Sequence, residues 1–577
     1  MSRPPVPSRS FRIACVTAAA GALCAGALVA APAAVADEPA IAVSLQGTYA
    51  TGIFDQSAAE IPAFDPITEQ LFVVNAQSGL ADVLSLGADG VPGKIGELSA
   101  AGRLAADGST VDEGAVVNSV AIANGIVALA VEADDKVQHG WALFFTTDDL
   151  TYLGGVRIGS LPDGLAFSPD GRFVVVANEG EPADDFSTDP EGTISVISVP
   201  ADAAGFADFS QDNVRTVDFR HFDEGTPLPE GVRVFGPDVP TPAGHEDAGY
   251  IARNLEPEYV VINASGTAAY VSVQEANAIA VVDLASATLS DLWALEIMDW
   301  SVDGRLDASD RDDAVNLQHW PIFGVPMPDG LGTYVVGGVD HVVTANEGDA
   351  REWGDYVDSV RAKNLTLCAE EFPNAAELLA DENLGRLNVL SDLGYDEARE
   401  CHHELYALGS RGFSIYTAAG ERVFDSGGQF EEIIAGLIES GDLPPEAFNS
   451  NHSEQPSDDN RSDDKGVEPE GVAIGTVGGR TYAFVGLERI GGFMIYDVTD
   501  PAGSFFVDYV NNRDFSAVYE DEDGDWQAAG DLGAEGLIFV PAADSPTGEA
   551  LVIVANEVSG TTSVFSVTAL APEPTQE

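Results

Sequence analysis

The sequence predicts an all-β protein, a seven-bladed β-propeller with long acidic loop insertions. One unit recurs along the chain: short apolar runs rich in β-branched and aromatic residues, bounded by Gly, Pro and Asp. The chain holds 60 Gly and 32 Pro in 577 residues, which suits many short strands joined by tight turns. A single unit cannot bury both faces of its sheet, so neighbours stacked around an axis would complete the core.

The clearest copy of this unit lies at residues 465–498, with strands expected at 472–475, 481–487 and 492–498. Six further copies begin at Ile61, Val117, Leu161, Glu256, Pro328 and Gly533. Seven copies predict seven sheets. Eight sheets are the alternative count, because the fifth copy spans two strand groups, the second of them at 404–424. The run 41–49 is expected to add an outer strand to the last sheet and so close the ring.

The ends of the chain predict an exported protein. Arg3, Arg9 and Arg12 precede a small apolar run, and Ala34-Val35-Ala36 is a cleavage motif. The predicted organisation is a signal peptide at 1–36, one propeller domain at 37–570 and a polar tail at 571–577. No later apolar run approaches the ~20 residues of a membrane span, and the tail has no anchor signal, so we expect a secreted, extracellular protein.

Charge and cysteines narrow the classes of partner. The chain has 95 Asp and Glu against 26 Lys and Arg, a net charge of −69. Such a field repels nucleic acid and anionic lipid and concentrates cations, so cations are the expected partners. Two of the four cysteines lie within 1–36, and the remaining pair, Cys368 and Cys401, is expected to form a disulfide.

Long insertions interrupt the repeated units. They are predicted at 201–254, 285–327, 351–403 and 426–466, and several are rich in Asp, Glu and Gly. Loops of this length are usually functional or disordered.

Carboxylates recur at two places in the repeated unit. Those before the first strand are Asp163, Glu258, Asp329, Glu470 and Glu535, and those after the second are Glu132, Glu179, Glu275, Glu347, Glu488 and Glu557. In a propeller the second strand returns to the face where the first begins, so these acids should meet near the axis. They would repel each other unless hydrogen bonds, arginines or cations compensate. We expect arginine partners for some and a hard cation, Ca²⁺, for others, because oxygen-only ligands select Ca²⁺ or Mg²⁺ over zinc.

A second calcium candidate lies at residues 299–310. Counted from the first residue, oxygen-bearing side chains fall at positions one, three, five, nine and twelve, and Gly304 holds position six, as in an EF-hand loop. The predicted ligands are Asp299, Ser301, Asp303, Asp307 and Asp310. The alternative is a solvated acidic loop, because position twelve is Asp rather than Glu and no flanking helices are evident.

Several catalytic motifs do not occur. The sequence has no H-E-x-x-H, no Cys/His cluster, no G-x-S-x-G elbow and no P-loop, so zinc protease, serine hydrolase and nucleotide-binding chemistry are not indicated.

Segments along most of the chain resemble one family. ANEGEP (177–182), TANEGDAR (344–351), RSDDKGVEPEGVA (461–473) and GLERIGGFMIYD (486–497) together are similar to the choice-of-anchor I domain proteins. These are exported bacterial proteins similar to mesenchyme-specific cell-surface glycoproteins. The resemblance, over about 61–567, implies a propeller in an extracellular setting. Some relatives carry an alkaline-phosphatase label, and phytase-like propellers bind phosphate at a calcium-lined acidic mouth.

Two functions therefore follow as hypotheses. One is a cation-binding surface or matrix module. The other is a calcium-dependent phosphomonoesterase acting on phosphorylated small molecules, in which metal ions at the axial acids polarise phosphate and activate water while Arg411 or Arg489 clamps the phosphate oxygens. The enzyme needs an unpaired arginine at a phosphate-sized cleft, whereas the module does not.

Overall fold

The computed structural model describes residues 41–312 and 314–570, and all of these belong to one compact unit, Pro39–Glu577. The predicted signal peptide, 1–36, and the predicted tail, 571–577, lie outside the described residues. None of the helices in the described part is long and apolar enough to cross a membrane.

The fold is all-β, and seven four-stranded antiparallel sheets form most of it. We number them as ring sheets 1 to 7. Sheet 1 comprises β2 (Pro62–Asp65), β3 (Gln70–Asn75), β4 (Leu80–Leu86) and β5 (Pro92–Ser99). Sheet 2 comprises β6 (Val116–Ala123), β7 (Ile126–Glu132), β8 (His139–Thr146) and β9 (Tyr152–Ser160). Sheet 3 comprises β10 (Pro162–Phe167), β11 (Phe173–Asn178), β12 (Thr193–Ser198) and β13 (Val214–Val217).

The remaining four follow the same order along the chain. Sheets 4 to 7 comprise β14 (Pro257–Ile262), β15 (Ala268–Val273), β16 (Ala278–Asp283) and β17 (Thr288–Ala294); β20 (Leu331–Val336), β21 (Val339–Asn346), β29 (Gly412–Thr417) and β30 (Arg422–Asp425); β32 (Pro469–Val477), β33 (Arg480–Leu487), β34 (Phe493–Asp497) and β35 (Phe505–Val510); and β38 (Ala534–Val540), β39 (Ala550–Asn556), β40 (Thr561–Ala569) and β1 (Ile41–Ala50). The run predicted at 41–49 is thus the outer strand of sheet 7, antiparallel to β40.

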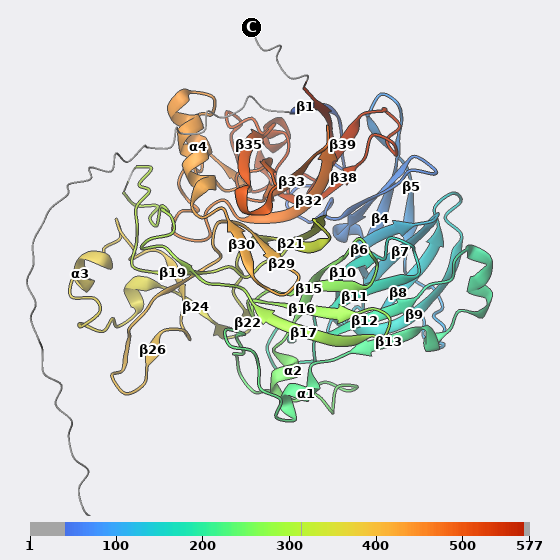
Figure 1. Ribbon diagram of the computed structural model, residues 1–577, viewed down its shortest axis with the longest axis horizontal. Coiled ribbons are helices and arrows are strands. Elements are labelled where there is room, and N and C mark those ends of the chain that lie inside the picture. Colours follow the sequence, from blue (N-terminus) through green and yellow to red (C-terminus); the bar gives the residue numbers. More distant parts are fainter. Residues whose placement is uncertain (1–40, 313, 571–577) are drawn as a thin grey trace, which may run out of the picture. The chain divides into compact units, whose positions relative to one another are not determined.

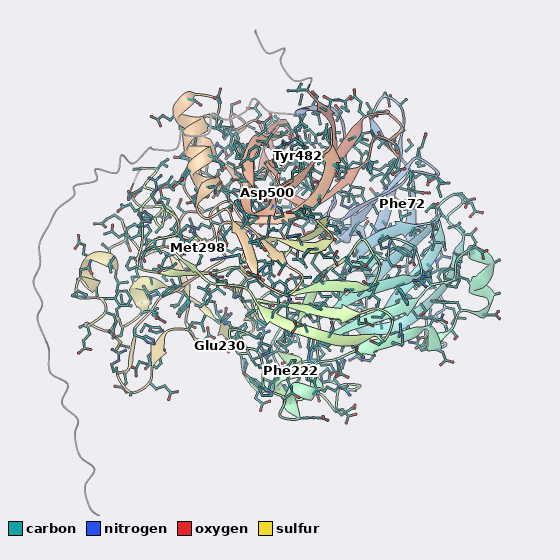
Figure 2. The ribbon with its side chains drawn as sticks, in the orientation of Figure 1. Phe72, Phe222, Glu230, Met298, Tyr482 and Asp500 are labelled. Atoms are coloured by element: carbon teal, nitrogen blue, oxygen red, sulfur yellow. A yellow bond between two sulfur atoms is a disulfide. The ribbon has the colours of Figure 1, made fainter. Side chains whose placement is uncertain are left out.

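The sheets form a closed ring. Each first strand contacts the first strand of the next sheet, and β2 of sheet 1 contacts β38 of sheet 7 (Figure 1). Apolar clusters fill the spaces between neighbouring sheets, and one of them joins Leu71 and Val73 of sheet 1 to Ile553 of sheet 7. Phe72 and Tyr482, both labelled in Figure 2, lie on second strands and are fully buried in such clusters. The core is therefore distributed between sheets around the ring.

Two predicted insertions begin too early. β13 lies inside 201–254 and β17 inside 285–327, and each is the fourth strand of its sheet. The reason is that outer strands are half-exposed and therefore contain polar residues. In β13 (VRTV) and β17 (TLSDLWA) these residues interrupt the apolar run by which a strand is recognised in the sequence. The first insertion then forms two single-turn helices, α1 (Arg220–Asp223) and α2 (Tyr250–Arg253), near the labelled Phe222 in Figure 2.

The second and third insertions build a five-stranded sheet of their own. It comprises β18 (Met298–Asp299), β19 (Phe323–Val325), β28 (Tyr406–Leu408), β25 (Asn388–Leu390) and β24 (Ser359–Arg361). Trp300, Trp320 and Leu387 form its core. The run at 404–408, predicted as an outer strand of sheet 5, belongs here instead, and only β29 and β30 complete sheet 5. The same region holds α3 (Ala375–Leu378), and its Cys368 and Cys401 form a disulfide.

The fourth insertion carries the longest helix, α4 (Gln429–Ser440), whose Phe430 and Ile434 pack into the cluster between sheets 5 and 6. Smaller pairings are β22 (Glu352–Trp353) with β23 (Tyr356–Val357), β26 (Tyr395–Asp396) with β27 (Cys401–His402), and β31 (Glu454–Gln455) with β36 (Tyr519–Glu520) and β37 (Asp523–Gly524).

All four insertions leave the ring on one face. They connect a second strand to a third or a fourth strand to the next first strand, and in an antiparallel sheet both connections lie at the end where the first strand begins. The recurring carboxylates lie at this end as well.

Candidate functional site

A cavity of about 460 Å³ lies where the first strands begin, and we call it the axial cavity. Its acidic lining residues are Glu60, Asp163, Glu179, Glu181, Glu258, Asp329, Glu347, Asp349, Glu470, Glu488, Glu535 and Glu557. Nine of the eleven recurring acids are among them. Glu132 and Glu275 are not part of the lining, and Glu275 is buried beside Arg351.

Backbone hydrogen bonds bring the two sets of acids together. The N–H of Glu179 donates to the carbonyl of Leu161 at 2.9 Å, two residues before Asp163. The same bond joins Glu488 to the carbonyl of Glu468 at 2.9 Å, and Glu557 to that of Gly533 at 2.8 Å. In these three sheets the acid after the second strand is thereby fixed next to the acid of its own first strand.

β-bulges aim the first-strand acids toward the axis. The pairing register shifts between Pro162 and Leu165, between Pro469 and Val472, and between Ala534 and Leu537. Asp163, Glu470 and Glu535 therefore lie inside bulges, which commonly redirect a side chain beside a functional site.

Glycines next to these acids allow the first strands to approach each other closely. A Cβ on Gly330 would lie 2.3 Å from the carbonyl oxygen of Glu470, and one on Gly471 would lie 2.1 Å from that of Glu535. One on Gly536 would lie 2.3 Å from the carbonyl oxygen of Glu60. Because no other residue fits at such contacts, the acid–glycine pairs pack the carboxylates into a narrow space.

The carboxylates of the axial cavity converge in two groups of three. Ligand atoms of Asp329, Glu470 and Glu535 all lie within 4.8 Å of one another, and so do those of Glu347, Glu470 and Glu488. We call the first group the oxygen trio. Glu470 belongs to both groups, is 8% exposed, and its Oε2 has no hydrogen-bond partner among the described residues. A buried oxygen without a partner is costly unless a proton or a cation satisfies it.

Several acids of the axial cavity hold protons unusually tightly. Burial, reinforced by neighbouring carboxylates, raises the pKa of Glu470 and of Glu535 well above the usual range. Burial likewise raises the pKa of Glu60 to about 7, and burial together with Glu488 raises that of Glu557 to about 8. Without a cation the cavity therefore keeps several protons at neutral pH.

Two cationic side chains line the axial cavity, and both are paired. Lys465 forms ion pairs with Glu347 and, at 3.1 Å, with Glu468. Arg489 bonds Glu468 at 3.0 Å and Glu488 at 3.1 Å. Burial alone would raise the pKa of Glu468, but Arg461, Arg489 and Lys465 hold it well below its usual range. The cations neutralise one side of the cavity, and the oxygen trio has no basic side chain bonded to it.

Arg411, predicted as a phosphate clamp, lies outside the axial cavity. It is 2% exposed, and its guanidinium donates to the carbonyl of Asp307 at 2.7 Å and to Glu431 of α4 at 2.6 Å. It also donates to the carbonyls of Ser462 and Asp464. Arg411 therefore joins the second and fourth insertions and uses all four of its terminal N–H donors within the protein.

The loop predicted to bind calcium is divided between two environments. Asp299 accepts hydrogen bonds from the N–H and hydroxyl of Ser301, while Asp303 accepts one from the N–H of Asp299. Asp307 is buried, with its N–H donating to Glu431, and Asp310 is held by Arg386 at 2.9 Å. Within the described residues, no three of the four aspartates of this loop form a close group of ligand atoms. Calcium binding there stays a prediction from the sequence alone.

Several residues of the axial cavity were not predicted. Glu181 and Asp349 each lie two residues after a predicted acid, in the repeated Asn-Glu-Gly-Glu/Asp segment, which could have identified them. Lys465 comes from the fourth insertion, and no repeat marks it. His452, from the same insertion, is not among the lining residues but contacts one of them. His452 lies 3.0 Å from Glu488, and with Glu557 these two residues form a third close group.

The fold and site define a closed ring of antiparallel sheets with a buried acidic centre, and comparison with known proteins identifies its family. The model of the choice-of-anchor I domain matches residues 60–501, and the chain belongs to that family. Gigasin-3a of Magallana gigas is 32% identical over 205 residues, which are 33% of this chain and 66% of that protein. The mesenchyme-specific cell surface glycoprotein of Strongylocentrotus purpuratus is 28% identical over 315 residues, 47% of this chain and 39% of that protein. The alignments thus cover less than two thirds of either relative.

Solved structures resemble this chain only distantly. Hydrazine synthase of Kuenenia stuttgartiensis matches with a TM-score of 0.40 and 12% identity, covering 91% of this chain and 100% of that one. Streptogramin B lyase matches with a TM-score of 0.40 and 7% identity, covering 92% and 98%. The β-propeller domain of Cps50 (Swd1) from Myceliophteria thermophila matches with a TM-score of 0.38 and 10% identity, covering 92% and 100%.

Proposed function

We propose that this protein is an extracellular seven-bladed β-propeller that binds a divalent cation, Ca²⁺, at the axis and acts as a surface or matrix module. The oxygen trio of Asp329, Glu470 and Glu535 carries the proposal, because its ligand atoms are close together and one buried oxygen has no partner. Ca²⁺ takes oxygen ligands at ~2.3–2.6 Å, and oxygens on opposite sides of one ion can lie about 4.8 Å apart. The extracellular setting is supported by the family and by the cell-surface name of one relative.

A second candidate is the calcium-dependent phosphomonoesterase. Lys465 and Arg489 line the same cavity as the oxygen trio, so a phosphate could meet both metal and cations there. Both side chains are held by carboxylates, however, and Arg411 lies outside this cavity and is paired with Glu431. Because the arginines predicted to bind phosphate are paired within the protein, the binding module is the better-supported function.

Calcium titration by calorimetry after chelation tests the proposal. We expect saturable binding to the wild type and its loss in Glu470→Gln, which removes the shared charge without changing size. The matched control is Glu179→Gln, a buried acid of the same cavity outside the three close groups, which should keep the stoichiometry. Equal binding by Glu470→Gln and wild type would reject the site.

An aryl-phosphate assay with and without Ca²⁺ separates the two functions. The binding module predicts no release of phosphate in either condition. Calcium-dependent turnover that is lost in Glu470→Gln would instead establish the phosphomonoesterase.

A further inference from the structure

A second polar cavity, of about 420 Å³, lies between ring sheets 2 and 3 and beneath the first insertion, away from the axial cavity. We call it the lateral cavity. Four of its lining residues are basic or ionisable to a cation: His139, Arg157, Arg220 and His245. The whole chain has 26 Lys and Arg and eight His against 95 acidic residues, so a group of four basic side chains is unusual for this composition.

Arg157 differs from the other described arginines, most of which form ion pairs or hydrogen bonds within the protein. Among residues 41–312 and 314–570 it is the one arginine whose guanidinium donates no hydrogen bond, and no carboxylate lies within 4.0 Å of it. The face of its guanidinium rests on Trp141, 4.0 Å from the ring centroid, which fixes its position and leaves its N–H groups free. Burial lowers the pKa of Arg157 below its usual value, because nearby acids do not fully compensate the charge.

The other basic residues of the lateral cavity differ in how they are engaged. His245 is held on both ring nitrogens, by the hydroxyl of Ser160 at 3.0 Å and by the N–H of Glu191 at 3.3 Å. Arg220 is paired with Glu191, with one contact of 2.7 Å. The ring of His139 packs edge-on against His245, with centroids 4.7 Å apart, and has no hydrogen-bond partner within the described residues.

Two carboxylates also line the lateral cavity, and both are engaged. Glu191 is neutralised by Arg220, and Asp218 accepts the N–H of Arg220 at 3.1 Å. Among the basic residues of the lateral cavity, the unused side-chain donors are therefore those of Arg157 and His139. Burial, followed by repulsion from Arg157, lowers the pKa of His139.

We propose that the lateral cavity binds a small ligand through an oxyanion group, a carboxylate, sulfate or phosphate, held by Arg157 and His139. The guanidinium offers paired N–H donors that match two oxygens of such a group. A volume of about 420 Å³ exceeds that of a bare ion and suits a ligand of monosaccharide size that carries the anion. This site would give the module a second, anion-selective function independent of the axial acids.

Calorimetric titrations with sodium sulfate, sodium phosphate and sodium glucuronate, at constant ionic strength in chloride, test the proposal and distinguish the sources of the oxyanion. We expect one-to-one saturable binding of at least one of them. Arg157→Gln should weaken it at least tenfold, since a hydrogen bond to a charged group contributes ~1.5–3 kcal/mol.

Arg103→Gln is the matched control. Arg103 also lacks a carboxylate partner and rests on aromatic rings, those of Phe145 and Tyr152, but it lies outside the lateral cavity, so binding should be unchanged. His139→Gln provides a second variant if Arg157→Gln unfolds at a lower temperature than the wild type, and it should also weaken binding. Glu470→Gln should bind the anion normally, which separates this site from the axial one. Absence of saturable binding of all three anions, or wild-type affinity in both lateral variants, would overturn the proposal.

Discussion

At the scale of single residues, Glu470 concentrates the chemistry of the axial cavity. It lies in a bulge, belongs to two close groups of acids and has a buried oxygen without a partner. In the absence of a cation, either its charge or the proton that it must take up opposes folding, and in the proposed calcium complex it would be a ligand. The same side chain should therefore destabilise the free protein and stabilise the bound one.

Substitution of Glu470 by Gln tests this double role through stability. At pH 8 without cations, Glu470→Gln should melt at a higher temperature than the wild type, because folding no longer has to bury this carboxylate or to protonate it. With millimolar Ca²⁺ the order should reverse, because binding to the native state stabilises only the protein that retains the site. Differential scanning calorimetry measures both, and a variant that gains as much from Ca²⁺ as the wild type would contradict the assignment.

Gly471 makes a separate prediction about packing at the axis. An added Cβ would lie 2.1 Å from the backbone carbonyl oxygen of Glu535, so Gly471→Ala must push two first strands apart. We expect a loss of ~1–3 kcal/mol in the free energy of unfolding, the usual cost of overpacking. Gly436→Ala, at an α4 position where a Cβ meets nothing within 4 Å, is the control and should not destabilise. Urea denaturation compares the two.

At the scale of elements, the insertions are fastened by ion pairs, and α4 offers two of them for comparison. In the buried pair, the side chains of Arg411 and Glu431 are 2% and 1% exposed. In the other pair, Arg305 contacts Glu432, the next residue of α4, and these side chains are 47% and 38% exposed. Arg411→Gln should cost ~3–5 kcal/mol because it leaves Glu431 buried and uncompensated. Arg305→Gln should cost less than ~1 kcal/mol. Limited proteolysis of the fourth insertion would report the difference, and equal protection in both variants would contradict it.

The sequence predicted the inner strands of the sheets better than the outer ones. Inner strands such as β11 and β33 are continuous apolar runs because both faces are buried, and the acids that follow them repeat in register. β13 and β17 have one exposed edge and polar residues, so no period marks them. Lys465, His452 and Arg157 were missed for another reason. Their contacts depend on how distant parts of the chain pack together, and no local sequence pattern encodes that packing.

At the scale of the whole molecule, proton binding and stability are linked through the axial acids. A carboxyl group with a higher pKa in the folded than in the unfolded state binds protons more tightly when folded, so stability falls as pH rises between the two values. For Glu60 and Glu557 this window extends from 4.5 to about 7 and about 8. The chelated protein should therefore melt at progressively lower temperature from about pH 5 to pH 8. Each unit of pKa shift is worth ~1.4 kcal/mol per group.

Added Ca²⁺ should flatten this pH profile, since a cation replaces the protons that the acids release. Thermal scans at pH 5, 6.5 and 8, with and without Ca²⁺, measure the effect. A chelated protein whose melting temperature rises steadily to pH 8 would show that these groups do not govern its stability.

The pairing of β1 with β40 has a mechanical consequence. Ile41 lies opposite Ala569, so the chain leaves this strand pair in both directions from the same end. Tension applied through those two residues would load the hydrogen bonds one after another from that end, as a zipper opens, rather than shearing all of them together. We therefore expect β1 to separate from β40 first, at low force, while the other six ring sheets stay intact.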